Sequence, residues 1–366
     1  MTDEVRRGRP LRIAMLAPPW IPVPPPAYGG VEAVVAPLCD ALVERHHHVE
    51  LFCAPGSSSS ATVRPQLAAA HPGRIGASLF ESDHVARAFA AIDAAMIGAA
   101  PFDVVHDHCG FTSLAMADRL DTPVVHTVHG PFDDDARAFY AHHARKGTIV
   151  CISRAQARTA PPGVRIGAVI PNPIDVNVWP SAAIKGDYLL WIGRMSPIKG
   201  PQIAISVARR AGRPLVLAGP VQPGFEEFFA ARIAPHVDGE AVRYVGEVGG
   251  ARKRELFADA HALLMPIRWP EPFGMVMVEA LACGTPVLAF AEGAAPEIVT
   301  HGATGFLVGD EHEMAAMVQA AGEIDSDRCR ASAAARWSPA RVASDYEVVY
   351  RAAMNSAAHR IIAPAA

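Results

Sequence analysis

The sequence lacks several features that would assign it to particular classes of protein. Its six cysteines form no C-x-x-C pair, so neither a zinc ribbon nor a disulfide framework is predicted, and we expect buried free thiols. No run of about 18 apolar residues occurs, so no transmembrane helix is predicted. A formal net charge of -4 argues against a nucleic-acid-binding protein, which usually carries a basic stripe. The G-x-G-x-x-G fingerprint is absent, which disfavours a dehydrogenase.

The length of 366 residues favours two domains over one. Residues 1–10 are charged and lack an apolar stretch, so we expect a short flexible lead-in and no signal peptide. With no predicted membrane segment, the predicted location is cytoplasmic.

Short apolar runs alternate with helix-length segments in two successive series. The first series predicts strands at 11–17, 48–54, 103–108, 123–129 and 148–153. The second series predicts strands at 188–193, 214–219, 242–245, 262–266, 286–290 and 305–308. This alternation is typical of doubly wound α/β domains with buried parallel strands.

The domain boundary is expected in the stretch 171–185, which is rich in proline and small residues. We therefore predict a first Rossmann-like domain at 1–178, a second at 179–337 and a final helical segment at 338–366. The ligand cleft is expected between the domains, at the carboxyl ends of both sheets.

Two acids, Glu271 and Glu279, stand eight positions apart in the most informative segment of the chain. On one helix they would be separated by a rise of roughly 12 Å and would face nearly the same side. Carboxylates accept hydrogen bonds from vicinal hydroxyls such as those of ribose and hexose, so the acids are candidate clamps on one ligand. The distance is too great for both to flank one glycosidic bond, as in a glycoside hydrolase. An ordinary amphipathic helix with Glu at both ends is the alternative.

Two loops that follow predicted strands are candidate anion sites. Gly29 and Gly30 precede a helical pattern, where backbone amides and the helix N-terminus favour a phosphate, although a plain tight turn is an equal alternative. Arg194 and Lys199 lie in the loop after the first strand of the second domain. Such cations stabilise charge on a departing diphosphate, whereas a solvated surface loop is the alternative.

Histidines lie at the ends of two predicted strands. His129 precedes a glycine where its strand gives way to a loop, whereas His126 is expected within the strand. His106 and His108 end another strand and are expected to line the same cleft. A histidine there can hydrogen-bond a sugar hydroxyl or take a proton. The histidines at 46–48 are interpreted as a solvated cluster at a helix end.

These motifs together resemble the retaining family-4 glycosyltransferases of the GT-B fold. The resemblance covers residues 11–350 and rests on the Tyr-Gly-Gly turn, the Thr-Val-His-Gly strand end, Gly-Arg-x-x-x-x-Lys-Gly, and Glu-x7-Glu followed by Ala-Cys-Gly-Thr-Pro. It implies two Rossmann-like domains facing across a cleft and a C-terminal helix that crosses back to the first domain. The proline-rich loop before the glycines loosely resembles a subgroup that includes an enzyme of antibiotic assembly, which implies a small-molecule acceptor.

The resemblance also implies roles for individual residues. The implied catalytic group comprises Arg194, Lys199, His129 and Glu271. The implied donor-binding group comprises Gly29, Gly30, Gly193, Val245, Glu247, Phe273, Gly274, Met275 and Glu279. Candidate residues on the acceptor side are Tyr28, His108 and His126. No metal or other cofactor is expected, because the cations and a helix N-terminus supply the positive field.

The implied activity is transfer of a hexose from a nucleotide diphosphate sugar, UDP-glucose as the first choice, to an unidentified small-molecule or glycan acceptor with retention of configuration. Front-face attack within an ion pair and double displacement through a carboxylate both remain open as routes. The alternatives are an epimerase or phosphorylase of the same fold, or a non-catalytic nucleotide-sugar-binding protein.

Overall fold

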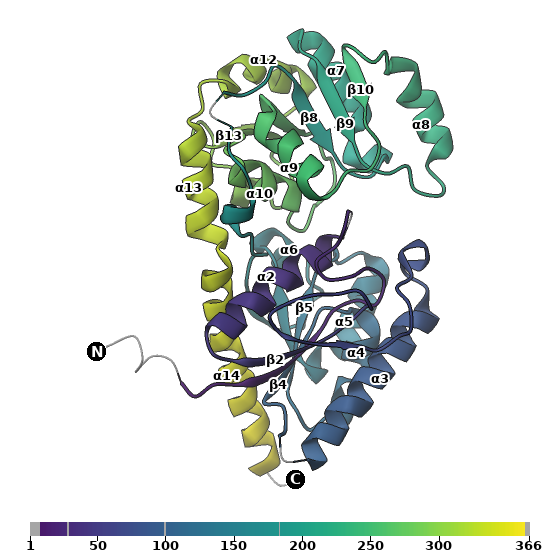
Figure 1. The fold of residues 1–366 in the computed structure, drawn as a ribbon, viewed down its shortest axis with the longest axis vertical. Coiled ribbons are helices and arrows are strands. Elements are labelled where there is room, and N and C mark those ends of the chain that lie inside the picture. The colour runs from purple at the N-terminus through teal and green to yellow at the C-terminus, as the bar shows by residue number, and fades with distance from the viewer. Residues whose placement is uncertain (1–7, 28, 99, 183, 363–366) are drawn as a thin grey trace, which may run out of the picture.

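The structure is a computed structural model that describes residues 8–27, 29–98, 100–182 and 184–362. Two lobes, each built on a parallel sheet, lie one above the other, and a long helical segment at the C-terminal end runs along one side of both (Figure 1). The two doubly wound α/β domains predicted from the alternation of apolar runs are therefore present.

The first domain contains a seven-stranded parallel sheet in the order β3-β2-β1-β4-β5-β6-β7. Its strands are β1 (Arg12–Leu16), β2 (His48–Cys53), β3 (Thr62–Pro65), β4 (Val104–Asp107), β5 (Val124–Val128), β6 (Thr148–Cys151) and β7 (Ile166–Val169). Its helices are α2 (Gly30–Glu44), α3 (Ser78–Ile97), α4 (Phe111–Ala115), α5 (Asp134–His143) and α6 (Arg154–Arg158). Every residue of β4 and β5 is buried, as is typical of parallel strands covered on both faces.

The second domain contains a six-stranded parallel sheet in the order β10-β9-β8-β11-β12-β13. Its strands are β8 (Leu189–Ile192), β9 (Leu215–Ala218), β10 (Val242–Tyr244), β11 (Ala262–Met265), β12 (Val287–Phe290) and β13 (Gly305–Val308). Its helices are α7 (Pro201–Ala211), α8 (Glu226–Arg232), α9 (Gly250–Asp259), α10 (Met275–Ala282), α11 (Ala295–Ile298), α12 (Glu311–Ala321) and α13 (Ser326–Trp337). Each strand of this sheet matches one predicted from the sequence.

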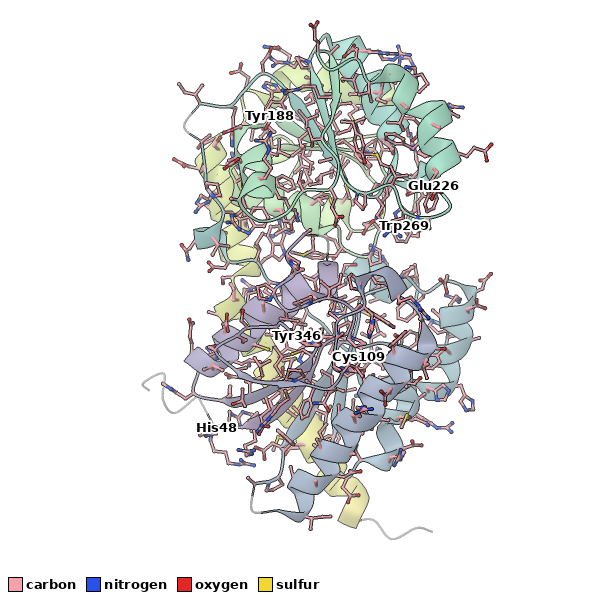
Figure 2. The ribbon with its side chains drawn as sticks, turned by 45° about the vertical axis from the view of Figure 1, so that its right-hand side comes forward. His48, Cys109, Tyr188, Glu226, Trp269 and Tyr346 are labelled. Atoms are coloured by element: carbon pink, nitrogen blue, oxygen red, sulfur yellow. The ribbon has the colours of Figure 1, made fainter. Side chains whose placement is uncertain are left out.

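The final helix, α14 (Pro339–Ile362), returns to the first domain, as predicted. It packs on α2 and on strands β4 and β5. Its buried side chains, among them Val342, Tyr346 and Tyr350, belong to an apolar core of the first domain. Figure 2 shows Tyr346 among the side chains of that domain. The helix therefore fixes the C-terminal end of the chain to the domain in which the chain begins.

A buried polar contact fixes α14 to the end of α2. Glu347 accepts hydrogen bonds from Arg45 Nε at 2.5 Å and Arg45 Nη2 at 2.9 Å, and its Oε1 lies 2.8 Å from His47 Nε2. Burial alone raises the pKa of Glu347, but the hydrogen bonds from Arg45 and His47 outweigh it and hold that pKa below its usual value. His47 is buried and its Nδ1 accepts from the Leu11 amide, so the interpretation of 46–48 as a solvated cluster is wrong for this residue.

All six cysteines are buried and free, as predicted. In the described part of the chain no helix is long and apolar enough to cross a lipid bilayer. The cytoplasmic location stays a prediction.

We predict that Glu347→Gln weakens the docking of α14. The substitution keeps the side-chain volume but removes the charge from a largely buried pair, so the free energy of unfolding should fall by about 2 kcal/mol. Urea unfolding followed by circular dichroism measures the change. Asp345→Asn, at an exposed position of the same helix, should change it by less than about 0.5 kcal/mol. Equal effects of the two substitutions would contradict the anchoring role of Glu347.

Candidate active site in the cleft between the domains

Two cavities meet between the domains. The larger has a volume of about 820 Å³ and the smaller about 530 Å³. Both receive residues from the start of α2 on one side and from the end of β8 and the start of α10 on the other. The start of α14 adds to the larger cavity, whereas the end of β5 and the loops after β4 and β11 add to the smaller one. The residues that line both cavities are Gly29, Gly30, Ile192, Gly193, Met275 and Val276. A ligand with two parts can therefore occupy both cavities across this junction.

Glu271 lies in the loop before α10, although the sequence placed it on the same helix as Glu279. The helix begins at Met275, because Gly274 at its N-cap has φ 83°, outside the helical region. Gly293 fixes the loop from behind: a Cβ there would lie 2.5 Å from the Glu271 amide nitrogen, so only glycine fits this close approach. The helical separation of the two acids is thus corrected. Glu271 lines the smaller cavity and Glu279 the larger.

Glu271 forms an ion pair with Lys199, which lies in the loop after β8, the strand next to β11. Lys199 Nζ lies 2.5 Å from Glu271 Oε2, and the same ammonium lies 4.9 Å from the centroid of the Trp269 ring. The backbone of Lys199 is held by Trp191, whose indole nitrogen donates to the Lys199 carbonyl at 3.0 Å. Trp269 lies at the edge of the second domain that turns toward the first (Figure 2). Two groups expected to contact different parts of one ligand therefore contact each other.

Glu279 has a lysine partner of its own. Lys253 Nζ, from α9, donates to Glu279 Oε1 at 2.6 Å. Glu279 is 3% exposed, and its Oε2 has no hydrogen-bond partner among the described residues. A buried carboxylate oxygen without a donor is costly, so a ligand hydroxyl at this position is favoured. The sequence did not identify Lys253, because it lies 26 residues from its partner and in no distinctive motif.

Two further sources of positive charge lie at or beside the junction, where the two cavities share lining residues. α2 begins at Gly30 with no side-chain cap at Gly29, so its first amides are available to an anion. On the opposite side Arg194 lines the smaller cavity, where its Nη1 donates to Gln222 Oε1 at a long 3.3 Å. Backbone amides at the junction and a guanidinium in the adjoining smaller cavity suit a phosphate between them.

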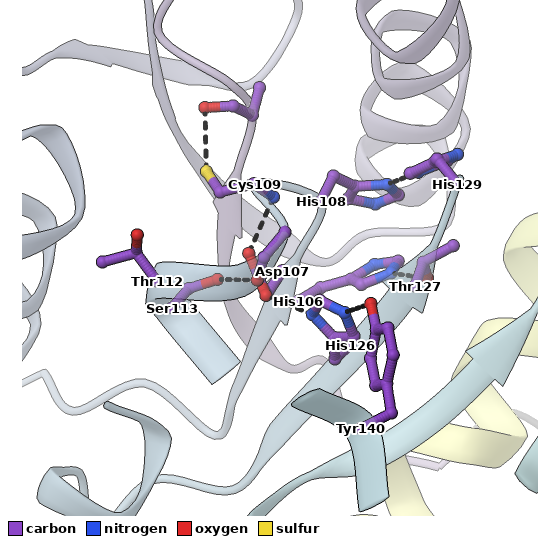
Figure 3. A network of polar contacts seen from close by, with 12 residues as sticks. His106, Asp107, His108, Cys109, Thr112, Ser113, His126, Thr127, His129 and Tyr140 are labelled. Atoms are coloured by element: carbon purple, nitrogen blue, oxygen red, sulfur yellow. Dashed lines mark hydrogen bonds and ion pairs between the residues drawn. The ribbon is translucent and has the colours of Figure 1, made fainter. Parts of the chain in front are cut away.

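His108 and His129 form a pair at the ends of β4 and β5 (Figure 3). His108 Nδ1 lies 2.8 Å from His129 Nε2, and both rings line the smaller cavity. Burial lowers the pKa of His129 to about 4 and that of His108 well below its usual value, so both rings are neutral near pH 7. One ring must therefore donate to the other, and the His129 ring can offer one further ring nitrogen to a ligand.

His126 lies behind the wall of the cleft. Its side chain is fully buried, with Nδ1 2.5 Å from Asp107 Oδ2 and Nε2 2.9 Å from the Tyr140 hydroxyl (Figure 3), and it lines neither cavity. Its position within β5 turns it into the sheet layer and away from the acceptor side that the sequence suggested. The structure gives it the place of a residue that holds Tyr140, which does line the smaller cavity.

His106 is also buried and connects β4 and β5 to the final helix. Its Nδ1 lies 2.7 Å from the Tyr350 hydroxyl and its Nε2 2.9 Å from Thr127 Oγ1, which in turn lies 2.9 Å from the Tyr346 hydroxyl. Thr127 is two positions before His129. The docking of α14 therefore also orders the strand end that carries His129.

The other predicted site residues are distributed as follows. Phe273, Gly274 and Met275 line the smaller cavity beside Glu271. Glu247 lines the larger cavity, whereas Val245 lines neither and its side chain is partly exposed. Tyr28 lies outside the described residues. Within the described residues, no cluster of three or more His, Cys, Asp or Glu side chains is arranged to hold a metal ion.

Comparison with known proteins gives one consistent result. A family model described as Glycosyltransferase Family 4 matches residues 28–178, and one described as Glycosyl transferases group 1 matches residues 180–339. AviGT4, a glycosyltransferase involved in avilamycin A biosynthesis, is 30% identical, with a TM-score of 0.71 over 94% of this chain and 98% of that one. HepE of Anabaena, solved with UDP and glucose, is 19% identical with a TM-score of 0.69 over 93% and 99% of the two chains.

A curated relative matches over a shorter stretch. The D-inositol 3-phosphate glycosyltransferase of Jonesia denitrificans is 27% identical over 257 residues. The alignment covers 57% of this chain and 60% of that enzyme, so this chain spans less than two thirds of that relative.

The buried neutral histidines predict acid sensitivity. Burial lowers the pKa of His84 and His129 to about 4 and of His106 and His108 further, so between pH 6.5 and 4 the unfolded chain binds more protons. The free energy of unfolding therefore falls as pH falls, by about 1.3 kcal/mol per histidine from pH 7.5 to 5.5. Burial raises the pKa of Glu32 to about 7, so its folded form takes up a proton over this range and the free energy of unfolding rises. With all five groups together, the free energy of unfolding falls by roughly 3 kcal/mol from pH 7.5 to 5.5.

Urea unfolding at pH 7.5 and 5.5 measures this loss. His84→Gln removes one titrating group outside both cavities, so its pH-dependent loss should be smaller by about 1.3 kcal/mol. A free energy of unfolding that does not change over this pH range would show that the histidines are not neutral in the folded protein.

Proposed function

The chain belongs to the family-4 glycosyltransferases of the GT-B fold, and from this premise we propose that it transfers a hexose from UDP-glucose to a small-molecule acceptor with retention of configuration. The observation that carries the proposal is the junction of the two cavities, with one candidate clamp acid in each. In this proposal the nucleoside occupies the larger cavity, the hexose occupies the smaller one, and the diphosphate spans the junction.

The nucleoside half of the donor is assigned from Glu279. Its unpartnered Oε2 would accept a hydrogen bond from a ribose hydroxyl while Lys253 holds Oε1. Glu247 and Val248 line the same cavity and are proposed to lie near the base. Uracil is the first choice of base because a solved structure of the same fold, HepE, was determined with UDP.

The hexose half is assigned from the smaller cavity. Glu271 and the amides of Phe273, Gly274 and Met275 are proposed to bind hexose hydroxyls, with His129 on the opposite side near the reacting carbon. Arg194, Lys199 and the first amides of α2 are proposed to hold the diphosphate. These groups stabilise the negative charge that develops as the diphosphate leaves, which is where the catalytic contribution is largest.

The proposed chemical step is attack by an acceptor hydroxyl on the face from which the diphosphate departs. The bond from the anomeric carbon to the phosphate oxygen breaks with its electron pair going to that oxygen, and the acceptor oxygen forms the new bond to the same carbon. The acceptor proton passes to the departing phosphate oxygen. This route requires cations and positioning from the protein rather than a carboxylate nucleophile.

A thermal-shift comparison of UDP with GDP tests the donor base. A ligand at a hundred times its dissociation constant stabilises the folded protein by about 2.7 kcal/mol, which is a rise of several degrees in Tm. We expect UDP to produce the rise and GDP to leave Tm unchanged. The anomeric proton coupling of the product then tests retention, and a product of inverted configuration would overturn the proposed step.

We predict that the two lysine–glutamate pairs affect different kinetic constants. Lys199→Ala should lower the kcat for UDP release from UDP-glucose by at least roughly 100-fold, because it removes charge stabilisation from the leaving group. Glu279→Gln should raise the donor KM by about 10-fold with little change in kcat, because it weakens a hydrogen bond made equally before and during reaction.

Initial rates of UDP release over a range of UDP-glucose concentrations measure both effects. Arg209→Ala, at an exposed position of α7, removes a cation from the same domain and should leave both constants within about twofold. The reverse pattern for Lys199 and Glu279 would overturn the division of roles, and UDP-glucose binding without UDP release in the parent protein would indicate a non-catalytic binding protein.

A further inference from the structure

The first domain lines the smaller cavity with a largely apolar surface, which we call the acceptor wall. We use the name for Pro18, Trp20, Ile21, Glu32, Ile75 and Phe111, which line the cavity together with the polar side chains of His108, Thr127, His129, Tyr140 and Asn172. Ile75 and Phe111 are 52% and 50% exposed, although most large apolar side chains of the domain are buried. Exposed apolar side chains that line a cavity mark a surface for an apolar ligand group.

The acceptor wall carries no positive charge. Among the described residues, the cations that line the smaller cavity are Arg194 and Lys199, and both come from the second domain. Arg74, next to Ile75 in sequence, lies 5.2 Å from the centroid of the Phe80 ring and does not line the cavity. A phosphorylated acceptor would need guanidinium or ammonium donors on this wall, because a phosphate that leaves water must be paired.

Glu32 is the charged residue of the acceptor wall. It lies in the first turn of α2 and is 5% exposed. Its own backbone amide contributes a hydrogen bond to its carboxyl group, and burial raises the pKa of that group to about 7. A largely buried carboxyl group that lines a cavity can form a hydrogen bond with a ligand group at this point.

The carboxyl group of Glu32 also lies close to the junction of the cavities. Its Oε2 is 3.1 Å from the position that a Cβ on Gly29 would occupy, and Gly29 lines both cavities. In the proposed function the diphosphate and the anomeric carbon lie at this junction. A hydroxyl group bound by Glu32 would therefore be near the carbon that it attacks.

We propose, on the basis of the proposed function, that the acceptor is an uncharged molecule with an apolar or aromatic body, whose hydroxyl group binds Glu32 and whose body contacts Trp20, Ile75 and Phe111. Glu32 is an acceptor-binding residue in this arrangement, and the proton of the attacking hydroxyl still passes to the departing diphosphate. Acceptors that carry a phosphate are disfavoured, since their charge would face Glu32 with no cation on the acceptor wall.

Three related probes test the class of acceptor by equilibrium binding in the presence of UDP. They are 4-nitrophenyl β-D-glucopyranoside, its 6-phosphate and methyl β-D-glucopyranoside. The aromatic body should lower Kd by about tenfold relative to the methyl glycoside. The added phosphate should raise Kd by at least about tenfold relative to the unphosphorylated nitrophenyl glycoside. Tighter binding of the phosphorylated probe, or equal binding of the methyl and nitrophenyl probes, would overturn the proposal.

Two variants assign the binding to particular residues. Phe111→Ala and Glu32→Gln should each raise the Kd of 4-nitrophenyl β-D-glucopyranoside by roughly tenfold, the first by removing an aromatic contact and the second by weakening a hydrogen bond. Matched controls are Leu79→Ala, at a 73% exposed position of α3 outside the cavity, and Glu81→Gln, also outside it. Both controls should leave Kd within about twofold. Unchanged binding in Phe111→Ala and Glu32→Gln would also overturn the proposal.

UDP release without any acceptor separates this proposal from the proposed function. Leu79→Ala and Glu81→Gln should keep the slow hydrolysis of UDP-glucose within about threefold of the parent, because neither residue lines a cavity and water replaces the acceptor. If the parent protein neither binds UDP nor hydrolyses UDP-glucose, the proposed function fails, whereas the binding comparison of the three probes still decides the class of ligand that the acceptor wall accepts.

Discussion

The parallel direction of the strands is the constraint on which the site depends. Because all strands of a sheet point the same way, every loop that follows a strand emerges at one edge, and the two sheets of this protein turn those edges toward each other. His108 and His129 follow β4 and β5, while Gly193 and Glu271 follow β8 and β11. Residues far apart in the chain therefore face one cleft.

The final helix adds a second constraint, because it crosses from one domain to the other. α14 is fixed to α2 through Glu347 and to the ends of β4 and β5 through Tyr346 and Tyr350. α2 carries the glycines at the junction of the cavities, and β5 leads to His129. The docking of α14 completes the core of the first domain. It therefore also orders α2 and the end of β5, through which that domain contributes to the cleft.

The sequence predicted the buried strands well, because strands covered on both faces need unbroken apolar runs. β3 and β7 were missed because they are short edge strands with exposed side chains. The separation of Glu271 and Glu279 by helical rise was wrong, since the positive φ of Gly274, which ends the loop before α10, is not visible in an apolar periodicity. The sequence did not identify Lys253 or Glu32, because neither lies in a distinctive motif. Folding brings Lys253 to Glu279 and places Glu32 in the smaller cavity.

In the proposed function, the two lysine–glutamate pairs balance the charge of the acids that bind a nucleotide-sugar donor. Hydroxyl groups are bound well by carboxylates, but a carboxylate beside a diphosphate repels it unless its charge is balanced. Glu271 and Glu279 each have a lysine within 2.6 Å, so the two clamp acids add little net negative charge to the cleft. An ammonium group has three rotatable donors, so Lys199 can hydrogen-bond Glu271 and a phosphate oxygen at the same time. The fixed planar donors of a guanidinium would not readily allow this. In the proposed function, the positive field of Arg194 and the α2 N-terminus then remains available to the diphosphate itself.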